Sequence, residues 1–498
     1  MRRAGRWTLA AALAVAGCQS SDPMPLAPGH TNGLSYPGLK RALGVVPTGI
    51  RTDPGEAEPR GEEPRGAADP REEPIDLGVA LRLAGADNPT INLARERVRE
   101  SLADQLAARS LLLPNLAVGG NFRAHNGPLQ TSGSTILDVK LRSLDLGFGT
   151  GAVGGGTATI PGIRLFAHLG DAAYEPLAAR QRVVARTADA AAVQNQVLLD
   201  VVVAYFELIG AEARLDILKT SEAEVAWIAK ITNDFADAGQ GIRADAKRAD
   251  TNRDLVVRQR ALAEGQVAAV SARLCRLLSL DTAVRLRTPG GPVEWLRLVD
   301  EEMDVESLIA TATSNRPEVA TQSAVIQVAQ TRVKQEKARP FLPILSIGFS
   351  AGGMGGGTSS SDLSPLGSRT DFDVFAVWNV QNLGFGNRAR VRMADATVGQ
   401  AVAYYEGTVN RIRREVMTAQ ADAQAANRQM TFAKASLIAA EDGYKLERER
   451  IRQGQGRPIE TLDSFRQLLE SRLEFLRAIT SFNIAQFRLF TALGRTPQ

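Results

Sequence analysis

Few residues of this 498-residue chain have side chains suited to acid–base, nucleophilic or metal chemistry. Two cysteines and three histidines are too few for a disulfide framework or a Cys/His zinc site. The glycine-rich stretch 147–156 contains Gly-x-Gly spacings, but no Gly-Lys-Ser/Thr follows, so we expect an external loop there and no phosphate site. Cys275 lies among leucines on an expected helix and is predicted to be a small buried hydrophobe. We therefore predict no catalytic, cofactor-binding or metal site and no enzyme.

For Cys18 the sequence indicates a covalent modification. Residues 1–17 carry basic residues, then a short apolar run, then small residues, which is the pattern of a secretory signal. The tetrapeptide Val15-Ala16-Gly17-Cys18 resembles the lipobox of bacterial lipoproteins, in which the cysteine thiol is acylated and becomes the mature N-terminus. Gln19 after it implies, by the same resemblance, the outer membrane. The alternative is a plain signal peptide with an incidental cysteine.

Residues 18–74 are rich in Pro, Gly and charge and cannot bury enough apolar surface to fold alone, so we expect a flexible tether. The formal charge is +4, and three of its arginines belong to the predicted signal, which leaves about +1 and gives no case for nucleic-acid binding. After the N-terminus no apolar run is long enough for a transmembrane helix. A chain of this kind can span a membrane only as a closed β-barrel.

Two Gly-Gln-Gly tripeptides, at 239–241 and 454–456, interrupt long helical patterns. Glycine readily takes positive φ and lets a chain reverse direction after a helix. Apolar residues at three-and-four spacing flank both tripeptides, which is the stripe of a helix that packs against another. Each tripeptide is therefore predicted to be the tip of a long helical hairpin.

The two tips belong to a tandem duplication, with repeats at 75–290 and 291–498. Each repeat has, in order, a helix that starts at a proline, two strands around a Gly-rich loop, a helix of about 67 residues (about 100 Å) and a return helix. We expect the strands of the first repeat at 116–122 and about 159–169. Those of the second repeat are expected from 345 and at 372–380, around a Gly/Ser loop at 352–364. The duplication is indicated by nearly equal spacings. Pro89 and Pro114 are 25 residues apart, and Pro317 and Pro343 are 26 apart. Gly170 and Gly239 are 69 residues apart, and Gly386 and Gly454 are 68 apart.

Four strands of about ten residues suit the wall of a tilted barrel but cannot close one. An open sheet edge is not tolerated in hydrocarbon, so closure requires several chains, and three would give twelve strands. The long helices need partners for their apolar stripes and are expected to pack side by side into a tube.

This layout resembles the TolC-type outer-membrane efflux proteins, the outer membrane factor family, in its lipidated branch. The resemblance covers roughly residues 75–495; no single motif is specific, but their order and spacing, seen twice, is. The motifs are Asn88-Pro89 with Leu113-Pro114-Asn115-Leu116, Asn315 to Pro317 with Leu342-Pro343, Val203-Ala204-Tyr205, Trp378 with Leu383-Gly384-Phe385-Gly386, and the two glycine tips.

The resemblance implies a mainly α fold with membrane β, a tandem-repeat protomer. Three copies would form a twelve-stranded outer-membrane β-barrel continued by a long periplasmic α-helical barrel. The homotrimer would be lipid-anchored in the outer membrane of a Gram-negative-type bacterium and extend into the periplasm. It would dock on a periplasmic adaptor (membrane fusion) protein and an inner-membrane transporter, with Gly239, Gly241, Gly454 and Gly456 at the docking turns.

The family closes its tunnel where the helix tips converge and acidic side chains form rings. Its pattern places an acid six residues after the turn glycine of the second repeat and another three later, which here are Glu460 and Asp463. Asp245 is the counterpart of Glu460 in the first repeat. Three copies of one carboxylate around a narrow axis attract cations and can gate or select. The alternative is that acids in a first helical turn only complement the helix dipole.

The leading hypothesis is a passive exit duct, gated at the periplasmic tips, for a tripartite efflux or export system. A periplasmic coiled-coil structural lipoprotein without a pore is the alternative, but it does not account for strand pairs at equal points of both repeats. The sequence identifies neither the cargo nor the class of pump.

Overall fold

The computed structural model describes residues 72–116, 118–131, 133–149, 163–300, 302–358 and 366–497. The predicted signal, Cys18 and nearly all of the predicted tether lie outside the described residues. The described residues belong to one unit, Asp69–Gln498.

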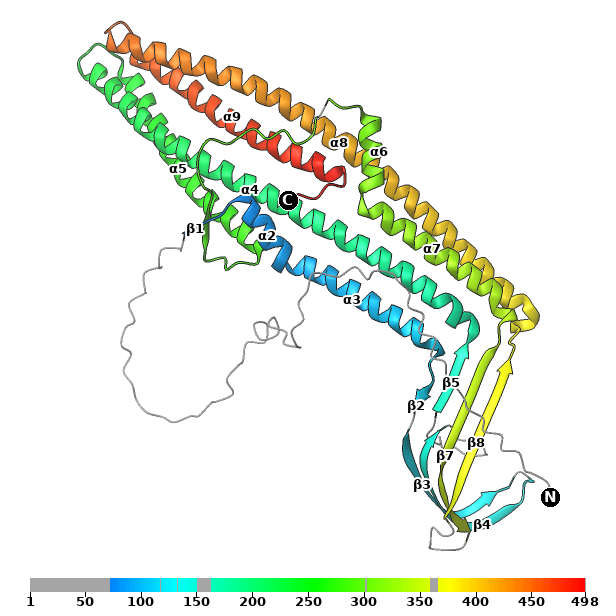
Figure 1. Cartoon of the computed structure of the whole chain (residues 1–498). Coiled ribbons are helices and arrows are strands. Elements are labelled where there is room, and N and C mark those ends of the chain that lie inside the picture. The colour runs from blue at the N-terminus through cyan, green and yellow to red at the C-terminus, as the bar shows by residue number, and fades with distance from the viewer. Residues whose placement is uncertain are drawn as a thin grey trace, which may run out of the picture. The chain divides into compact units, whose positions relative to one another are not determined.

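Four long helices form two antiparallel hairpins, one in each half of the chain (Figure 1). Helix α4 (Leu169–Asp237) returns as α5 (Arg243–Leu278), and α8 (Phe385–Arg452) returns as α9 (Pro458–Ala492). Helices α4 and α8 have 69 and 68 residues, so each is about 100 Å long. The predicted long helices and their return legs are therefore confirmed. None of the described helices has the length and hydrophobicity to cross a bilayer.

Shorter helices precede the strands in both halves and begin alike. In the first half they are α2 (Leu77–Asp87) and α3 (Pro89–Arg109), and in the second α6 (Val305–Asn315) and α7 (Pro317–Ala338). Asp76 Oδ1 accepts a hydrogen bond from Val79 N at 2.7 Å, and Asp304 Oδ2 accepts one from Ser307 N at 3.1 Å. Both are side-chain N-caps, and a proline opens the next helix in each half. The duplication thus extends to the helix caps.

Helix α4 is the centre of the helical packing, because it contacts α3, α5, α7 and α9 (Figure 1). Leu218 and Ile228 of α4 and Phe465 of α9 are fully buried in one apolar cluster. Burying side chains of this size contributes about 1.5–3 kcal/mol each. The apolar stripes predicted beside the tips therefore form the core between the two hairpins.

Six strands form one antiparallel sheet at the end of the helices that is remote from the tips (Figure 1). Strand β7 pairs with β8 on one edge. On its other edge, residues 344–349 pair with β5 and residues 350–358 pair with β4. Strands β4 and β5 thus follow each other along the same edge of β7. Strands β3 and β2 pair with them on the side remote from β7. The strands are β2 (Asn115–Leu116), β3 (Val118–Gln130), β4 (Ile136–Gly149), β5 (Ile163–His168), β7 (Ile344–Thr358) and β8 (Leu366–Val377).

Short elements complete the described chain. Strands β1 (Glu72–Pro74) and β6 (Arg285–Arg287) pair in parallel. The 3₁₀ helices are η1 (Ser110–Leu112), η2 (Arg339–Phe341) and η3 (Gln381–Gly384).

The sheet corrects two sequence predictions. Of the strand expected at 159–169, residues 163–168 form β5 and 159–162 lie outside the described residues, while the long β4 in line with β5 was missed. The glycines at 147–149 and the stretch 352–358 lie in strands and not in loops, although 150–156 and 359–364 fall outside the described residues. Glycine lacks a side chain and gives no alternating pattern, but its backbone still pairs, as Gly147 does with Gly352.

The register gives the sheet two different faces. On one face apolar residues lie opposite each other in rows across three strands: Ile163, Phe349 and Phe372; Leu165, Ile347 and Val374; Ala167, Leu345 and Ala376. On the other face Asp373 lies in the same row as Gly348 and Arg164, and Ser350 Oγ donates to Asp371 Oδ2 at 3.1 Å. Successive side chains of a strand point to opposite faces, so where β5, β7 and β8 pair one face is mainly apolar. The other face carries Arg164 and Asp373 beside Phe166 and Phe375, and farther along β4 Lys140 and Arg142 lie on the first face.

Two buried amides of α9 hold the segment that joins the repeats. Asn483 accepts from Leu296 N at 3.0 Å and donates to the Glu294 carbonyl at 2.8 Å. Gln486 Oε1 accepts from Leu298 N and Val299 N at 3.0 and 2.9 Å. Both amides are 0% exposed, so their loss would leave buried backbone groups without partners.

We expect Gln486→Leu to destabilise the protein by about 2 kcal/mol, because two backbone N–H groups lose their acceptor. The measurement is thermal unfolding in detergent, followed by circular dichroism at the helical signal. Gln467→Leu is the matched control on an exposed position of the same helix. Equal melting temperatures for the two variants would contradict the anchoring role of Gln486.

Candidate functional site: the helix tips

The two hairpin tips have the same backbone structure. After α4, Gly239 has φ +71° and Gln240 N donates to the Phe235 carbonyl at 3.0 Å. After α8, Gly454 has φ +72° and Gln455 N donates to the Arg450 carbonyl at 2.9 Å. Each is a Schellman motif, the helix ending that requires a left-handed residue. The predicted glycine tips are confirmed.

The second glycine of each tip is required for a different reason. A Cβ on Gly241 would lie 3.3 Å from the backbone nitrogen of Ala236, and one on Gly456 would lie 3.3 Å from the backbone nitrogen of Ile451. The chain thus passes close to the helix that it has just left, and a side chain would push it away.

Two of the three predicted acidic residues lie in the first turns of the return helices, and Asp463 is the sixth residue of α9. Asp245 is the third residue of α5, and Glu460 is the third residue of α9. Their backbone amides donate to the carbonyls of Ile242 and Arg457 at 2.9 and 3.1 Å, so the two positions are equivalent. Carboxylates at this place interact favourably with the helix dipole.

Each predicted gate residue has a basic neighbour in the single chain. Asp245 lies 3.2 Å from Arg248, Glu460 lies 3.7 Å from Arg450 of α8, and Asp463 lies 3.9 Å from Arg466. The side chain of Asp463 is 71% exposed, so its long ion pair contributes little. Asp245 lies on the first tip and the other two on the second, and the structure brings Glu460 and Asp463 onto one helix end.

Asp250, which the sequence analysis missed, connects the two helices of the first tip. Its Oδ1 accepts from Asn233 Nδ2 of α4 at 3.0 Å, and Lys247 lies 3.4 Å from its Oδ2. The hydrogen bond from Asn233 and the nearby lysine charge lower the pKa of Asp250 below its usual value.

A polar contact joins the two hairpins a few turns above the tips. Glu224 of α4 accepts from the Tyr444 hydroxyl at 2.7 Å and from Arg448 at 3.3 Å, both on α8. The Arg448 guanidinium lies 5.3 Å from the centre of the Trp227 ring. Burial and the hydrogen bond to Glu224 raise the pKa of Tyr444. Separating the hairpins requires breaking these contacts, which we call the inter-hairpin link.

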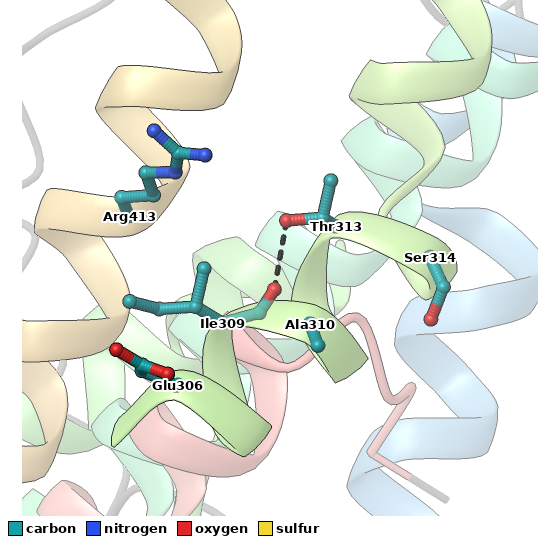
Figure 2. A pocket seen from close by; sticks show the side chains of 6 residues that line it. All are labelled: Glu306, Ile309, Ala310, Thr313, Ser314 and Arg413. Atoms are coloured by element: carbon teal, nitrogen blue, oxygen red, sulfur yellow. Dashed lines mark hydrogen bonds between the residues drawn. The ribbon is translucent and has the colours of Figure 1, made fainter.

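A surface cavity of about 670 Å³ lies between α6 and α8, away from the tips (Figure 2). Its lining combines Glu306, Thr313, Ser314 and Arg413 with two apolar residues, and the Thr313 hydroxyl donates to the Ile309 carbonyl at 2.7 Å. The lining has neither a histidine nor a cysteine. In the part of the chain that the structure describes, no three potential metal-ligand side chains cluster.

Comparison with known proteins identifies the fold first. The solved outer-membrane channel OprN is 19% identical with a TM-score of 0.69, and the match covers 89% of this chain and 98% of that one. The open-state MtrE outer membrane channel of Neisseria gonorrhoeae is 19% identical with a TM-score of 0.67, covering 86% and 90%. At this identity the likeness shows the fold alone, which is that of an outer-membrane channel subunit.

The sequence comparisons find similarity over parts of the chain. Residues 308–495 match the family model described as outer membrane efflux protein. Outer membrane protein OprJ of Pseudomonas aeruginosa is 26% identical over 331 residues, which span 64% of this chain and 65% of the length of OprJ. The second half of the chain is thus similar to the outer membrane efflux proteins.

We expect Gly454→Ala to destabilise the second tip by about 1 kcal/mol, because alanine is strained at positive φ. Gly443→Ala is the matched control, since Gly443 is within α8, has open space around it and should gain about 0.5–1 kcal/mol. Thermal unfolding and limited proteolysis at the tip measure both. A Gly454→Ala variant as stable as Gly443→Ala would disprove the need for glycine here.

Proposed function

We propose that three copies of this chain form a passive exit duct through the outer membrane, without catalysis of their own, for a tripartite efflux or export system. The energy for transport would come from an inner-membrane transporter, reached through a periplasmic adaptor. The observation that carries the proposal is the two-faced sheet at one end of helices about 100 Å long. One face suits lipid, and the other suits a water-filled bore.

The helical packing supports assembly from several copies. Helix α7 packs between α4 and α8, and Thr321 and Ala324 of α7 are 7% and 2% exposed. Leu93 and Glu96 occupy the same places after Pro89 in α3, but Leu93 is 54% exposed and the Glu96 side chain 50%. Helix α3 therefore presents the face that α7 buries, and a second copy can cover it.

The sheet argues against a structural lipoprotein without a pore. Phe372 and Val374 are 70% and 55% exposed on its apolar face. Large apolar side chains in this number on one face indicate contact with lipid or another protein. A coiled coil in the periplasm would leave these apolar side chains exposed to water.

The anchor and the partners are part of the same proposal. Acylation at Cys18 would fix each copy to the outer membrane by its N-terminus, and mass spectrometry of the mature N-terminus tests it. The adaptor would bind at the hairpin turns, Gly239 to Gly241 and Gly454 to Gly456. Those turns end the helices on the side remote from the sheet.

We propose that Glu460 and Asp463, with Asp245 as a weaker candidate, form the cation-sensitive ring at the tips. Asp463 carries most of this assignment, because it is the most exposed of the three and its arginine is the most distant. Threefold repetition would place its carboxylates around one axis, where like charges repel and cations bind.

The duct is tested on the full-length protein purified in detergent. Imaging should show trimers with a central bore, and insertion into a planar bilayer should give discrete ion currents. A monomeric particle that produces no current would refute the duct.

We expect Glu460→Gln combined with Asp463→Asn to weaken block of the current by multivalent cations by on the order of tenfold, because the ring loses its charge. Glu470→Gln with Glu474→Gln is the matched control, since both acids are exposed on α9 farther from the tip. Unchanged block in the first variant would remove the gate assignment and leave the duct intact.

A further inference from the structure

Two cationic side chains lie on the mainly apolar face of the sheet, beyond the end of its apolar rows. Arg142 and Lys140 share this face with Leu144, because alternate residues of β4 point to the same side. Lys140 is exposed, and Arg142 is partly buried. Charge is costly on a barrel surface at the middle of a bilayer and is tolerated near its boundaries. The position of the two cations along the strands therefore decides what they contact.

The register places both cations at the end of the sheet that is remote from the helices (Figure 1). Strand β7 starts directly after α7 and η2 and runs away from them. Arg142 lies opposite Gly357 near the far end of β7. Lys140 lies beyond the last pair of β4 and β7, opposite Asn126 of β3. In the proposed duct this end of the sheet lies in the outer leaflet, because the helices extend into the periplasm.

The apolar rows between the helices and these cations match the height of a membrane. On this face they run from the row of Leu345 to the row of Gly355, in which Leu144 lies, and their paired residues include no ionisable residue. Gly355 is ten residues after Leu345. That distance is about 34 Å along an antiparallel strand and about 26 Å in height at a tilt of about 40°. Apolar bands of membrane barrels are about 25 Å tall, so Arg142 lies in the first row outside the hydrocarbon.

Trp378 marks the other boundary of the band. It follows the last residue of β8 and is 60% exposed, and its indole N–H donates to the Phe341 carbonyl at 3.3 Å. Tryptophan is enriched where a membrane protein leaves the hydrocarbon. The band is thus bounded by an indole on the periplasmic side and by two cations on the outer side.

We propose that Arg142 and Lys140 bind the phosphate groups of a glycolipid in the outer leaflet, whose acyl chains cover the apolar rows next to them. A guanidinium binds phosphate with two parallel N–H groups, and an ammonium adds a compact point charge. The inference rests on the proposed duct and adds a lipid that its outer end binds.

The surroundings of the two cations favour an anionic headgroup. A cation beside hydrocarbon loses part of its water, and an anion compensates for that loss better than a neutral group. Asp138 lies on the same face in the next row outward and is exposed. From the membrane to the water the face thus carries apolar rows, two cations and one carboxylate. A phosphate is attracted to the cations and repelled by Asp138 beyond them, which holds it at the edge of the apolar band.

The test uses the full-length protein purified in detergent, with lipid binding measured by native mass spectrometry. The probes are a bisphosphorylated glycolipid of the lipid A type and the same glycolipid without its phosphates. Arg142→Gln combined with Lys140→Gln removes both cations. Arg164→Gln combined with Lys219→Gln is the matched control, because it also removes one exposed arginine and one exposed lysine, from the other face of the sheet and from α4.

We expect the unaltered protein and the control to bind the phosphorylated glycolipid at least tenfold more tightly than the dephosphorylated one, and the Arg142/Lys140 variant to lose this preference. Equal affinity of the unaltered protein for both glycolipids would overturn the site. So would an equal loss of preference in the control, or release of the glycolipid by an equal concentration of inorganic phosphate.

Ion currents in a planar bilayer, recorded with the same preparations, separate the site from the duct. Discrete currents together with no preference for phosphate would overturn the lipid site alone. An unaltered protein that produces no current would refute the duct.

Discussion

The structure depends on the packing between its two repeats. Helix α4 of the first repeat lies against α7 of the second, and β4 and β5 lie against β7. Each chain forms this contact between repeats once. Because of the duplication, it has two copies of each surface that takes part in the contact. The counterparts of those surfaces have no partner among the described residues: the exposed face of α3 and two strand edges. In the proposed duct of several copies, the next copy would cover them.

The same packing determines where the helix tips lie. The core between the hairpins extends past the inter-hairpin link to Ala249 of α5 and Leu462 of α9, within two turns of the tips. At the turns themselves the structure relies on backbone hydrogen bonds and exposed ion pairs, which contribute little individually.

The sequence was sufficient for those features that depend on local conformation. The glycine pairs predicted the tips, because positive φ and close chain approach are properties of single positions such as Gly239 and Gly456. Prolines predicted the starts of α3 and α7 in the same way. For β4 the sequence analysis made no prediction at 136–146, although Leu137, Val139 and Leu141 alternate with charged residues there, and it assigned the glycines at 147–149 to a loop. The pairing that forms this strand comes from β3 and β7.

Contacts between residues far apart in the sequence could not be predicted from sequence patterns. Glu224 and Tyr444 are 220 residues apart, and neither differs in local sequence from an ordinary surface position. In the sequence Asn483 and Gln486 are only polar residues on an apolar helix. The segment that they bind, around residues 294–299, is close to them only in the folded chain. The sequence analysis placed the acidic residues beside the turns, but it did not name Arg248, Arg450 and Arg466 as their basic neighbours.

The inter-hairpin link also has a mechanical consequence. Arg448, the residue of the link nearest the turn, lies six residues before Gly454, so the second hairpin extends about 9 Å past the link. A stiff helix pivoting by about 9° at that point would displace its far end by roughly 1.4 Å, given the rise of an α-helix. Applied to every copy around an axis, so small a swing changes the radius of an aperture by about the radius of a water molecule.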